Sequence, residues 1–246
     1  MELREFFEAN PRGALAFSGG VDSSYLLWAA KEYGAQVRPI FVKTPFQPDF
    51  ELADARRLCE ELGAELKILH LELPAPVLAN PEDRCYHCKH ALFGQLWRAA
   101  KEEGYDLLLD GTNASDDPTD RPGMKALTEL RVLSPLRLCG LTKAEIRERS
   151  RTAGLFTWDK PAYACLATRF PTGTEITEAG LSKVEKAENL LFSLGFSDFR
   201  VRYFAGAARI QVPLAQMEKL LSQREAILTA LRPEFRGVFL DLEGRP

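Results

Sequence analysis

A glycine- and serine-rich segment near the start of the chain has the residue types to hold a phosphate. Residues 18–24 read Ser-Gly-Gly-Val-Asp-Ser-Ser and lie between a short apolar run and a stretch with helical spacing. Two glycines let the backbone approach a ligand closely, and a helix start presents unpaired N–H groups to an anion. The segment contains no lysine, so it differs from the phosphate loop of kinases and GTPases.

Asp22 stands in the middle of this segment, where a carboxylate would repel a phosphate unless a cation lies between them. We therefore interpret Asp22 as a Mg²⁺ ligand that faces a pyrophosphate. The alternative is a plain strand–turn–helix in which this aspartate caps the helix. The other residues expected to contact the nucleotide are Ser18, Gly19, Gly20, Val21, Ser23 and Ser24.

The chain has five cysteines, and two of them form a Cys-x-x-Cys pair, Cys85 and Cys88. Such a pair alone allows zinc, a redox disulfide or an iron–sulfur site, and no second pair completes a zinc ribbon. Cys165 is the remaining candidate partner. Cys59 lies inside a helical run and Cys139 follows an apolar, strand-like stretch, so both are expected to be buried as small hydrophobic residues.

Two arginines alternate on a predicted strand. Arg200 and Arg202 flank Val201, so both guanidinium groups are expected to point to one face of the strand. Such a pair suits a phosphate monoester, which accepts bidentate hydrogen bonds. A solvated charged face is the alternative interpretation.

The elements that position these residues follow an alternating pattern. The sequence predicts strands at 14–17, 37–42, 66–71 and 107–109, and helices at 21–33, 50–62 and 88–103. Strands that alternate with helices indicate an α/β fold with a doubly wound parallel sheet, which binds ligands at the carboxyl ends of its strands. Both residues 18–24 and the long polar loop 110–124 follow strands in this way, so the loop is expected to be functional.

A second, smaller unit is predicted after this sheet. Thr142 and Glu145 form a capping box that begins a helix ending near Gly154, and residues 158–173 form a linker that carries a site. Beyond the linker, the pattern predicts an α+β unit with helices at 178–194 and 214–231 and strands at 199–204, 209–212 and 238–242. We place the domains at 1–168 and 169–246, the second for substrate binding or oligomerisation.

Composition narrows the function classes. The chain has 246 residues, with 32 Lys and Arg against 35 Asp and Glu, so a net charge of −3 argues against a nucleic-acid partner. No run of about 18 apolar residues is present, which argues against a membrane span. An odd number of cysteines and an N-terminus unlike a signal peptide favour the cytoplasm.

Five segments together resemble the LarE-type sulfur transferases of the PP-loop ATP pyrophosphatase superfamily, which has an adenine nucleotide alpha hydrolase-like fold. The resemblance runs from Ser18 to the last strand, and its most specific part is residues 165–174. The five segments are SGGVDSS, RCYHCK, LDGTNASDD, RPGMKAL and CLATRFPTGTEIT.

The resemblance implies a reaction in the synthesis of the nickel-pincer nucleotide cofactor. ATP adenylates a carboxylate of pyridinium biscarboxylate mononucleotide and releases pyrophosphate, and sulfur then displaces AMP to give a thiocarboxylate. In one version of the family a cysteine at the place of Cys165 gives up its own sulfur. In the other, three cysteines hold a 4Fe-4S cluster, and this chain has all three, at Cys85, Cys88 and Cys165. Three ligands leave one iron open to hydrosulfide from a donor.

The resemblance also implies roles for residues outside these motifs. Arg169 would steady the adenylate or the transferring sulfur, and Arg200 and Arg202 would bind the ribose phosphate of the substrate. Glu188 would be a metal ligand, with an exposed helix charge as the alternative, and the chain would form a homo-oligomer. Nucleotide and metal contacts would come from Asp110, Gly111, Thr112 and residues 121–123.

Three other functions fit parts of the pattern. A PP-loop enzyme of tRNA thiolation also uses three cysteines, although the acidic balance of this chain weighs against it. An amidating ligase of the NAD or GMP synthetase type would leave Cys85 and Cys88 without a role. A regulator would bind ATP without releasing pyrophosphate.

Overall fold

The computed structural model describes residues 1–116 and 122–245, and for Pro122 it describes the backbone alone. The chain divides into two compact units. Unit 1 consists of Met1–Val77 and Asp83–Lys160, and unit 2 of Leu78–Glu82 and Pro161–Pro246. Among the described helices, none combines the length and apolar character needed to cross a membrane.

Unit 1 is built on a four-stranded sheet whose strands are all parallel. The order is β3 (Lys67–His70), β2 (Gln36–Lys43), β1 (Arg12–Ala16) and β4 (Leu108–Leu109). The central strands are apolar on both faces, as parallel strands covered by helices must be. The predicted α/β class with a parallel sheet is therefore confirmed.

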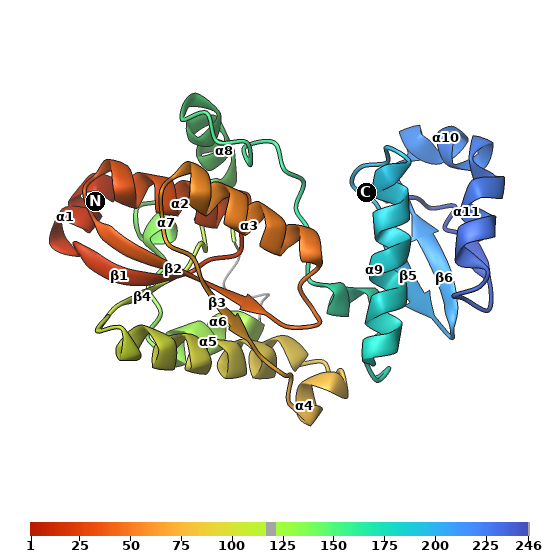
Figure 1. Ribbon diagram of the computed structural model, residues 1–246, viewed down its shortest axis with the longest axis horizontal. Coiled ribbons are helices and arrows are strands. Elements are labelled where there is room, and N and C mark those ends of the chain that lie inside the picture. Colours follow the sequence, from red (N-terminus) through yellow and green to blue (C-terminus); the bar gives the residue numbers. More distant parts are fainter. Residues whose placement is uncertain (117–121, 246) are drawn as a thin grey trace. The chain divides into compact units, whose positions relative to one another are not determined.

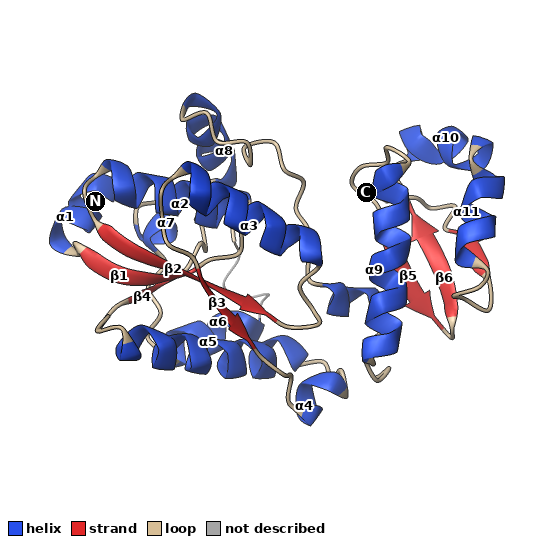
Figure 2. Cartoon of the chain, viewed as in Figure 1, coloured by secondary structure: helices blue, strands red, loops and turns tan. Residues whose placement is uncertain are grey.

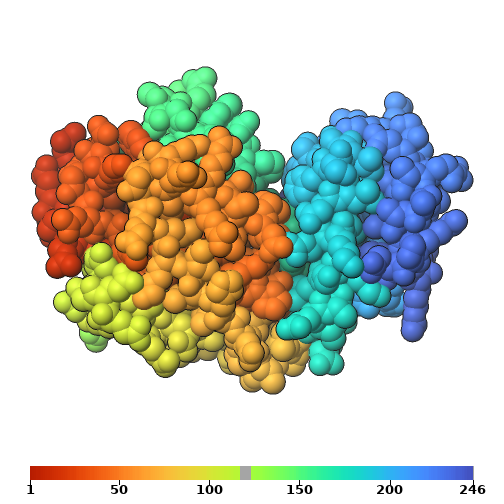
Figure 3. Space-filling view, viewed as in Figure 1, coloured from red at the N-terminus to blue at the C-terminus, as the bar shows by residue number. Residues whose placement is uncertain are grey.

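Helices cover both faces of this sheet (Figure 1). A core on one face is formed by side chains from α1 (Leu3–Ala9), α2 (Val21–Glu32), α3 (Asp49–Glu61), α7 (Pro135–Leu138) and α8 (Lys143–Thr152). A second core, on the other face, uses α5 (Arg84–Glu102) and α6 (Pro122–Glu129). In the space-filling view the orange atoms of α3 form part of the visible surface of unit 1 (Figure 3).

Unit 2 pairs three strands with helices around its own core (Figure 2). Its strands β5 (Arg200–Phe204) and β6 (Ala207–Gln211) are antiparallel, and β7 (Val238–Leu240) runs parallel to β6. The helical elements are η1 (Leu166–Arg169), α9 (Glu178–Ser193), η2 (Leu214–Gln216), α10 (Met217–Ser222) and α11 (Arg224–Leu231).

The continuous helix predicted over 214–231 is wrong, because the structure has three short helical pieces there. Gln223 ends α10 and precedes α11, with φ −101° and ψ 12°. The apolar positions Leu220, Ile227 and Leu231 keep helical spacing across this break, and all three are buried. Periodicity therefore could not reveal the break.

A short segment from the first half of the chain completes unit 2. Asn80 in Leu78–Glu82 is fully buried, with φ 57°, and its Nδ2 donates to the carbonyls of Pro171 at 2.7 Å and Thr174 at 3.1 Å. Its own carbonyl accepts from the Gly173 N–H at 2.8 Å. The helix α4 (Ala75–Leu78) leads into this segment.

Unit 1 ends at Lys160, before the boundary that the sequence predicts after Thr168. Residues 161–168 belong with unit 2 because Arg200 and Arg202 of β5 donate to the carbonyls of Ala162 and Thr168. The role assigned to the second domain stays a prediction.

Candidate functional site

The glycine and serine segment joins β1 to α2 at the carboxyl end of the sheet. Gly20 is the N-cap of α2 and receives no side-chain cap, so the alternative that Asp22 caps the helix is wrong. Hydroxyl groups brace the turn instead, because Ser18 Oγ lies 3.1 Å from Ser23 Oγ and the Ser23 hydroxyl donates to the Gly20 carbonyl at 3.3 Å. The first N–H groups of α2 therefore stay available to an anion.

Gly19 meets two constraints that only a glycine satisfies. Its φ of +68° lies in the left-handed region. A Cβ atom at this position would lie 3.0 Å from the backbone nitrogen of Ala55 and 3.1 Å from the carbonyl oxygen of Glu51, both in α3. The close approach of α3 therefore fixes the path of the loop.

Asp22 meets a lysine from a distant part of the chain. Lys143 Nζ lies 2.6 Å from Asp22 Oδ2, and Asn113 Nδ2 lies 3.4 Å from Asp22 Oδ1. The side chains of Asp22 and Lys143 are 23% and 34% exposed, so both are accessible to a ligand. Sequence reasoning missed Lys143, although the capping box at Thr142 places it in the first turn of α8.

The loop after β4 packs against the beginning of α2. A Cβ at Gly111 would lie 3.0 Å from the Ser23 nitrogen and 3.3 Å from the Asp22 Cβ. Asp110 is buried, and its carboxylate accepts from the Thr112 hydroxyl at 2.5 Å and the Thr112 N–H at 3.2 Å. The structure thus brings together the two loops that the sequence placed at one sheet edge. Arg121, also predicted there, lies outside the described residues.

The donor set at this edge fits a nucleotide with its metal. Mg²⁺ in phosphate sites takes one or two carboxylates from the protein and its other ligands from phosphates and water. Asp22 is an accessible carboxylate of this kind, beside hydroxyl and N–H donors for the phosphates. Within the described parts of the chain, no group of three or more His, Cys, Asp or Glu could hold a metal by itself.

The predicted metal-binding cysteines fall in both units. Cys85 and Cys88 lie in the first turns of α5, which begins at Arg84, earlier than the predicted start at Cys88. Their spacing puts both thiols on one side of the helix. Cys165 lies in unit 2, directly before η1, where its carbonyl accepts from the Thr168 N–H at 3.0 Å.

The other two cysteines are packed in unit 1. Cys59 is buried, as predicted, and burial raises the pKa of its thiol to about 12. Cys139 is half-buried against the same core, and burial raises the pKa of its thiol as well. Neither is a ready thiolate at neutral pH, because a raised pKa keeps sulfur protonated.

Unit 2 contains a buried ion pair. Glu188 accepts from Arg169 Nε at 2.7 Å and Arg169 Nη2 at 3.0 Å, from the Val201 N–H at 2.9 Å and from the Tyr163 hydroxyl. The side chains of Arg169 and Glu188 are 0% and 1% exposed, so the alternative of an exposed helix charge is wrong. Burial lowers the pKa of Arg169, but the bonds to Glu188 outweigh it and raise the pKa overall.

Arg200 and Arg202 reach the same segment of chain beside this pair. Arg200 Nη2 donates to the Ala162 carbonyl at 2.7 Å, and Arg202 Nη1 donates to the Thr168 carbonyl at 2.6 Å. Val201 between them is buried in the core, as predicted for alternating residues. Arg200 is itself buried, so a fully solvated charged face is wrong.

The three guanidinium groups outnumber the one carboxylate among them. Burial and the neighbouring Arg169 lower the pKa of Arg200 to about 10, so it remains a cation at neutral pH. The same two causes lower the pKa of Arg202. The Tyr163 ring contacts two of the cations, with its centroid 4.6 Å from the guanidinium carbon of Arg169 and 5.3 Å from that of Arg200. This excess of positive charge suits a phosphate dianion.

Comparison with known proteins finds relatives along nearly the whole chain, although no protein-family model matches it. An uncharacterized protein of Synechocystis sp., slr1717, is 38% identical over 98% of this chain and 92% of its own length. Pyridinium-3,5-bisthiocarboxylic acid mononucleotide synthase of Lactiplantibacillus plantarum is 33% identical over 95% of this chain and 86% of its own length. A tRNA-specific 2-thiouridylase of Clostridium botulinum is 28% identical over 60% of this chain and 51% of its own length.

Proposed function

Because the chain belongs to the LarE family of ATP-using sulfur transferases, we propose that it makes a thiocarboxylate of the nickel-pincer nucleotide pathway. In this proposal, ATP adenylates a carboxylate of pyridinium biscarboxylate mononucleotide, and pyrophosphate leaves. A sulfur nucleophile then attacks the adenylated carbonyl carbon, and AMP departs with the electrons of the carbon–oxygen bond. The synthase from Lactiplantibacillus plantarum, named for the bisthiocarboxylic product, supports this substrate.

The observation that carries the proposal is the convergence of two loops on Asp22 at the carboxyl end of the sheet. Gly111 packs on the start of α2, and Asn113 and Lys143 contact the Asp22 carboxylate. Here the α2 N–H groups and the serine hydroxyls would bind phosphate oxygens. Mg²⁺ held by Asp22 would compensate charge on the outgoing pyrophosphate.

We assign the arginines of unit 2 to the substrate. Arg200 and Arg202 would bind the phosphate of the mononucleotide, and Arg169 would steady the adenylate or the sulfur. A metal at Glu188, which the family resemblance allows, would have to displace the Arg169 guanidinium that this carboxylate binds at 2.7 Å. We therefore assign Glu188 to holding Arg169 in position.

For the sulfur source, we propose a 4Fe-4S cluster held by Cys85, Cys88 and Cys165 that supplies sulfide from an external donor. The placement of the first two thiols one helical turn apart in α5 supports this. The rival is consumption of the sulfur of Cys165 itself. We further propose a homo-oligomer in the cytoplasm, where free thiols persist.

The reaction is tested by anaerobic incubation of the chain with ATP, Mg²⁺, the biscarboxylate mononucleotide and sulfide. We expect pyrophosphate and AMP in equal amounts and a product in which sulfur replaces carboxylate oxygen, detected by mass spectrometry. Pyrophosphate release that depends on unmodified tRNA instead would favour tRNA thiolation. Incorporation of ammonia rather than sulfur would favour an amidating ligase.

A further inference from the structure

The lysine that contacts Asp22 is not explained by the helix that carries it. Lys143 is the first residue of α8, where the positive end of the helix dipole disfavours a cation. Thr142 and Glu145 already cap the helix reciprocally, so α8 does not need the lysine. A ligand anion that binds next to the start of α8 would explain why a lysine occupies this position.

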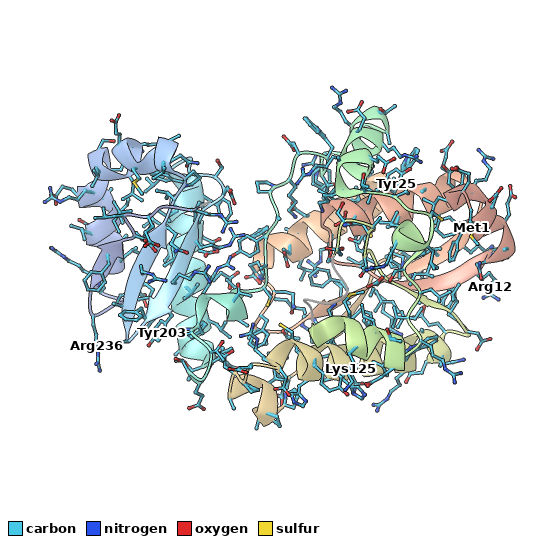
Figure 4. The ribbon with its side chains drawn as sticks, turned by 180° about the vertical axis from the view of Figure 1, so that it is seen from behind. Met1, Arg12, Tyr25, Lys125, Tyr203 and Arg236 are labelled. Carbon is cyan, nitrogen blue, oxygen red and sulfur yellow. The ribbon has the colours of Figure 1, made fainter. Side chains whose placement is uncertain are left out.

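Several contacts fix where this ammonium lies. The Lys143 N–H donates to Ser115 Oγ at 3.0 Å, which ties the start of α8 to the loop after β4. Further along, α8 packs on α2, with Tyr25 on the side of α2 that faces α8 (Figure 4). Tyr25 is buried, and the charge of Arg149 of α8 lies close enough to its hydroxyl to favour the ionised form. The two helix starts therefore meet in a defined register at Asp22.

We propose that Lys143 is the phosphate-binding cation that the lysine-free loop lacks, and that it changes partner when nucleotide binds. Without nucleotide the ammonium neutralises Asp22, at 2.6 Å. With Mg²⁺ and ATP, Asp22 passes to the metal, and the ammonium passes to an oxygen of the β or γ phosphate. This assignment rests on the proposed function, because it takes ATP as the ligand.

The chemistry of the ligand and the exposure of the side chain support the exchange. A departing pyrophosphate carries more negative charge than one Mg²⁺ neutralises, and phosphoryl-transfer sites combine the metal with a lysine. The Lys143 side chain is 34% exposed and flexible, so its ammonium can rotate from a carboxylate to a neighbouring phosphate.

A second lysine near the loop has a different role. Lys160 Nζ pairs with Asp54 Oδ2 at 2.5 Å and donates to the Gly19 carbonyl at 3.3 Å. Its carboxylate partner lies in α3, outside the nucleotide loops. Lys160 therefore holds the backbone of the loop in place, and Lys143 is the lysine assigned to the phosphates.

The test compares ATP and AMP binding to the full-length chain by calorimetry at saturating Mg²⁺. Lys143→Met keeps side-chain length and removes the charge, and Lys143→Arg keeps the charge. Lys67→Met is the matched control, because Lys67 makes a 2.8 Å pair with Glu103 and is 24% exposed. It lies at the start of β3, whereas the nucleotide loops follow strand ends.

We expect Lys143→Met to weaken ATP binding at least about tenfold and to change AMP binding less than about twofold, because AMP lacks the phosphates assigned to the lysine. Lys143→Arg should recover most of the ATP affinity, and Lys67→Met should match the wild type. Unchanged ATP affinity in Lys143→Met would overturn the assignment, and so would equal losses for ATP and AMP. Wild-type chain that binds no ATP would overturn the proposed function itself, before any variant is compared.

Discussion

The carboxylates of Asp22 and Glu188 differ in burial, and this difference suits Asp22 to ligand binding and Glu188 to holding another side chain in position. Asp22 is 23% exposed and meets a lysine that can move away, so a metal can replace that lysine. Glu188 is 1% exposed and accepts hydrogen bonds from two side chains and one backbone N–H. The first carboxylate can therefore exchange partners, whereas the second is committed to Arg169.

At Asp22, we expect Asp22→Asn to lower pyrophosphate release at least about 100-fold, because the amide loses the charge that holds the metal, and such a metal contributes several kcal/mol. Release is measured with the mononucleotide and ATP present. Asp106→Asn is the control, since Asp106 pairs with Lys101 on the surface. Release at the wild-type rate in Asp22→Asn would remove this residue from the metal site.

At Glu188, we expect Glu188→Gln to lower the free energy of unfolding of unit 2 by about 3–5 kcal/mol, because it leaves the Arg169 charge buried without its partner. Urea titration followed by a probe in unit 2 measures the change. Glu234→Gln makes the same chemical change at an exposed pair with Lys186, 3.2 Å long, and should cost about 0–1 kcal/mol. Equal small losses in the two variants would contradict the role given to Glu188.

At the scale of elements, the glycine loop is shaped by α3 as much as by its own sequence. Gly19 and Gly34 both have positive φ, at 68° and 77°. A Cβ on Gly19 would meet the α3 backbone, whereas a Cβ on Gly34 would meet nothing within 4 Å. Alanine substitutions at Gly19 and Gly34 therefore distinguish the destabilisation caused by a left-handed backbone from that caused by a steric clash.

We expect Gly34→Ala to lower the stability of the chain by about 1–2 kcal/mol and to leave ATP affinity unchanged, since only left-handed strain is added. Gly19→Ala should add the clash with α3 and weaken ATP binding as well. Thermal unfolding and calorimetric ATP titration of both variants check this. If ATP affinity were the same in the two variants, the proposed fit of the loop against α3 would be wrong.

Sequence patterns predicted helices and strands well where the residues of a single element were enough to recognise it. The helix at 21–33 and the strands at 37–42 and 66–71 are found within about two residues, because Gly34 marks the end of the helix and short apolar or alternating runs mark the strands. The capping box at Thr142 is also confirmed. The four-residue helices α4 and α7 were missed, since one turn is too short to show a period.

Patterns did less well where partners are distant in sequence. The sequence put Arg200 and Arg202 on one face, but nothing local showed that Arg169 and Glu188 form a buried pair. The contact of Lys143 with Asp22 joins residues that are 121 positions apart. Such pairs depend on how helices pack, which a single sequence does not display.

At the scale of the whole molecule, the proposed chemistry draws on both units. Nucleotide groups lie in unit 1 with Cys85 and Cys88, and substrate arginines lie in unit 2 with Cys165.

Protein purified without oxygen should be brown, with visible absorbance that fades in air, because the proposed iron–sulfur cluster absorbs visible light. Cys85→Ala should be colourless and should stop repeated turnover. Cys139→Ala, at a half-buried cysteine packed in the core, should stay brown. Colourless wild type with one zinc per chain would contradict the cluster. Loss of one sulfur from Cys165 after turnover, seen in the intact mass, would identify that residue as the donor.

The buried side-chain amide of Asn80 affects whether the C-terminal part of the chain can be expressed as a separate fragment. Its Nδ2 donates to the carbonyls of Pro171 and Thr174, and the backbone carbonyl of Asn80 accepts from the Gly173 N–H. A recombinant fragment that starts at Pro161 would lack this asparagine and leave those groups without partners. Residues 161–246 are therefore not an independent module, and during translation residues 78–82 can complete their contacts only after the last third of the chain has been synthesised.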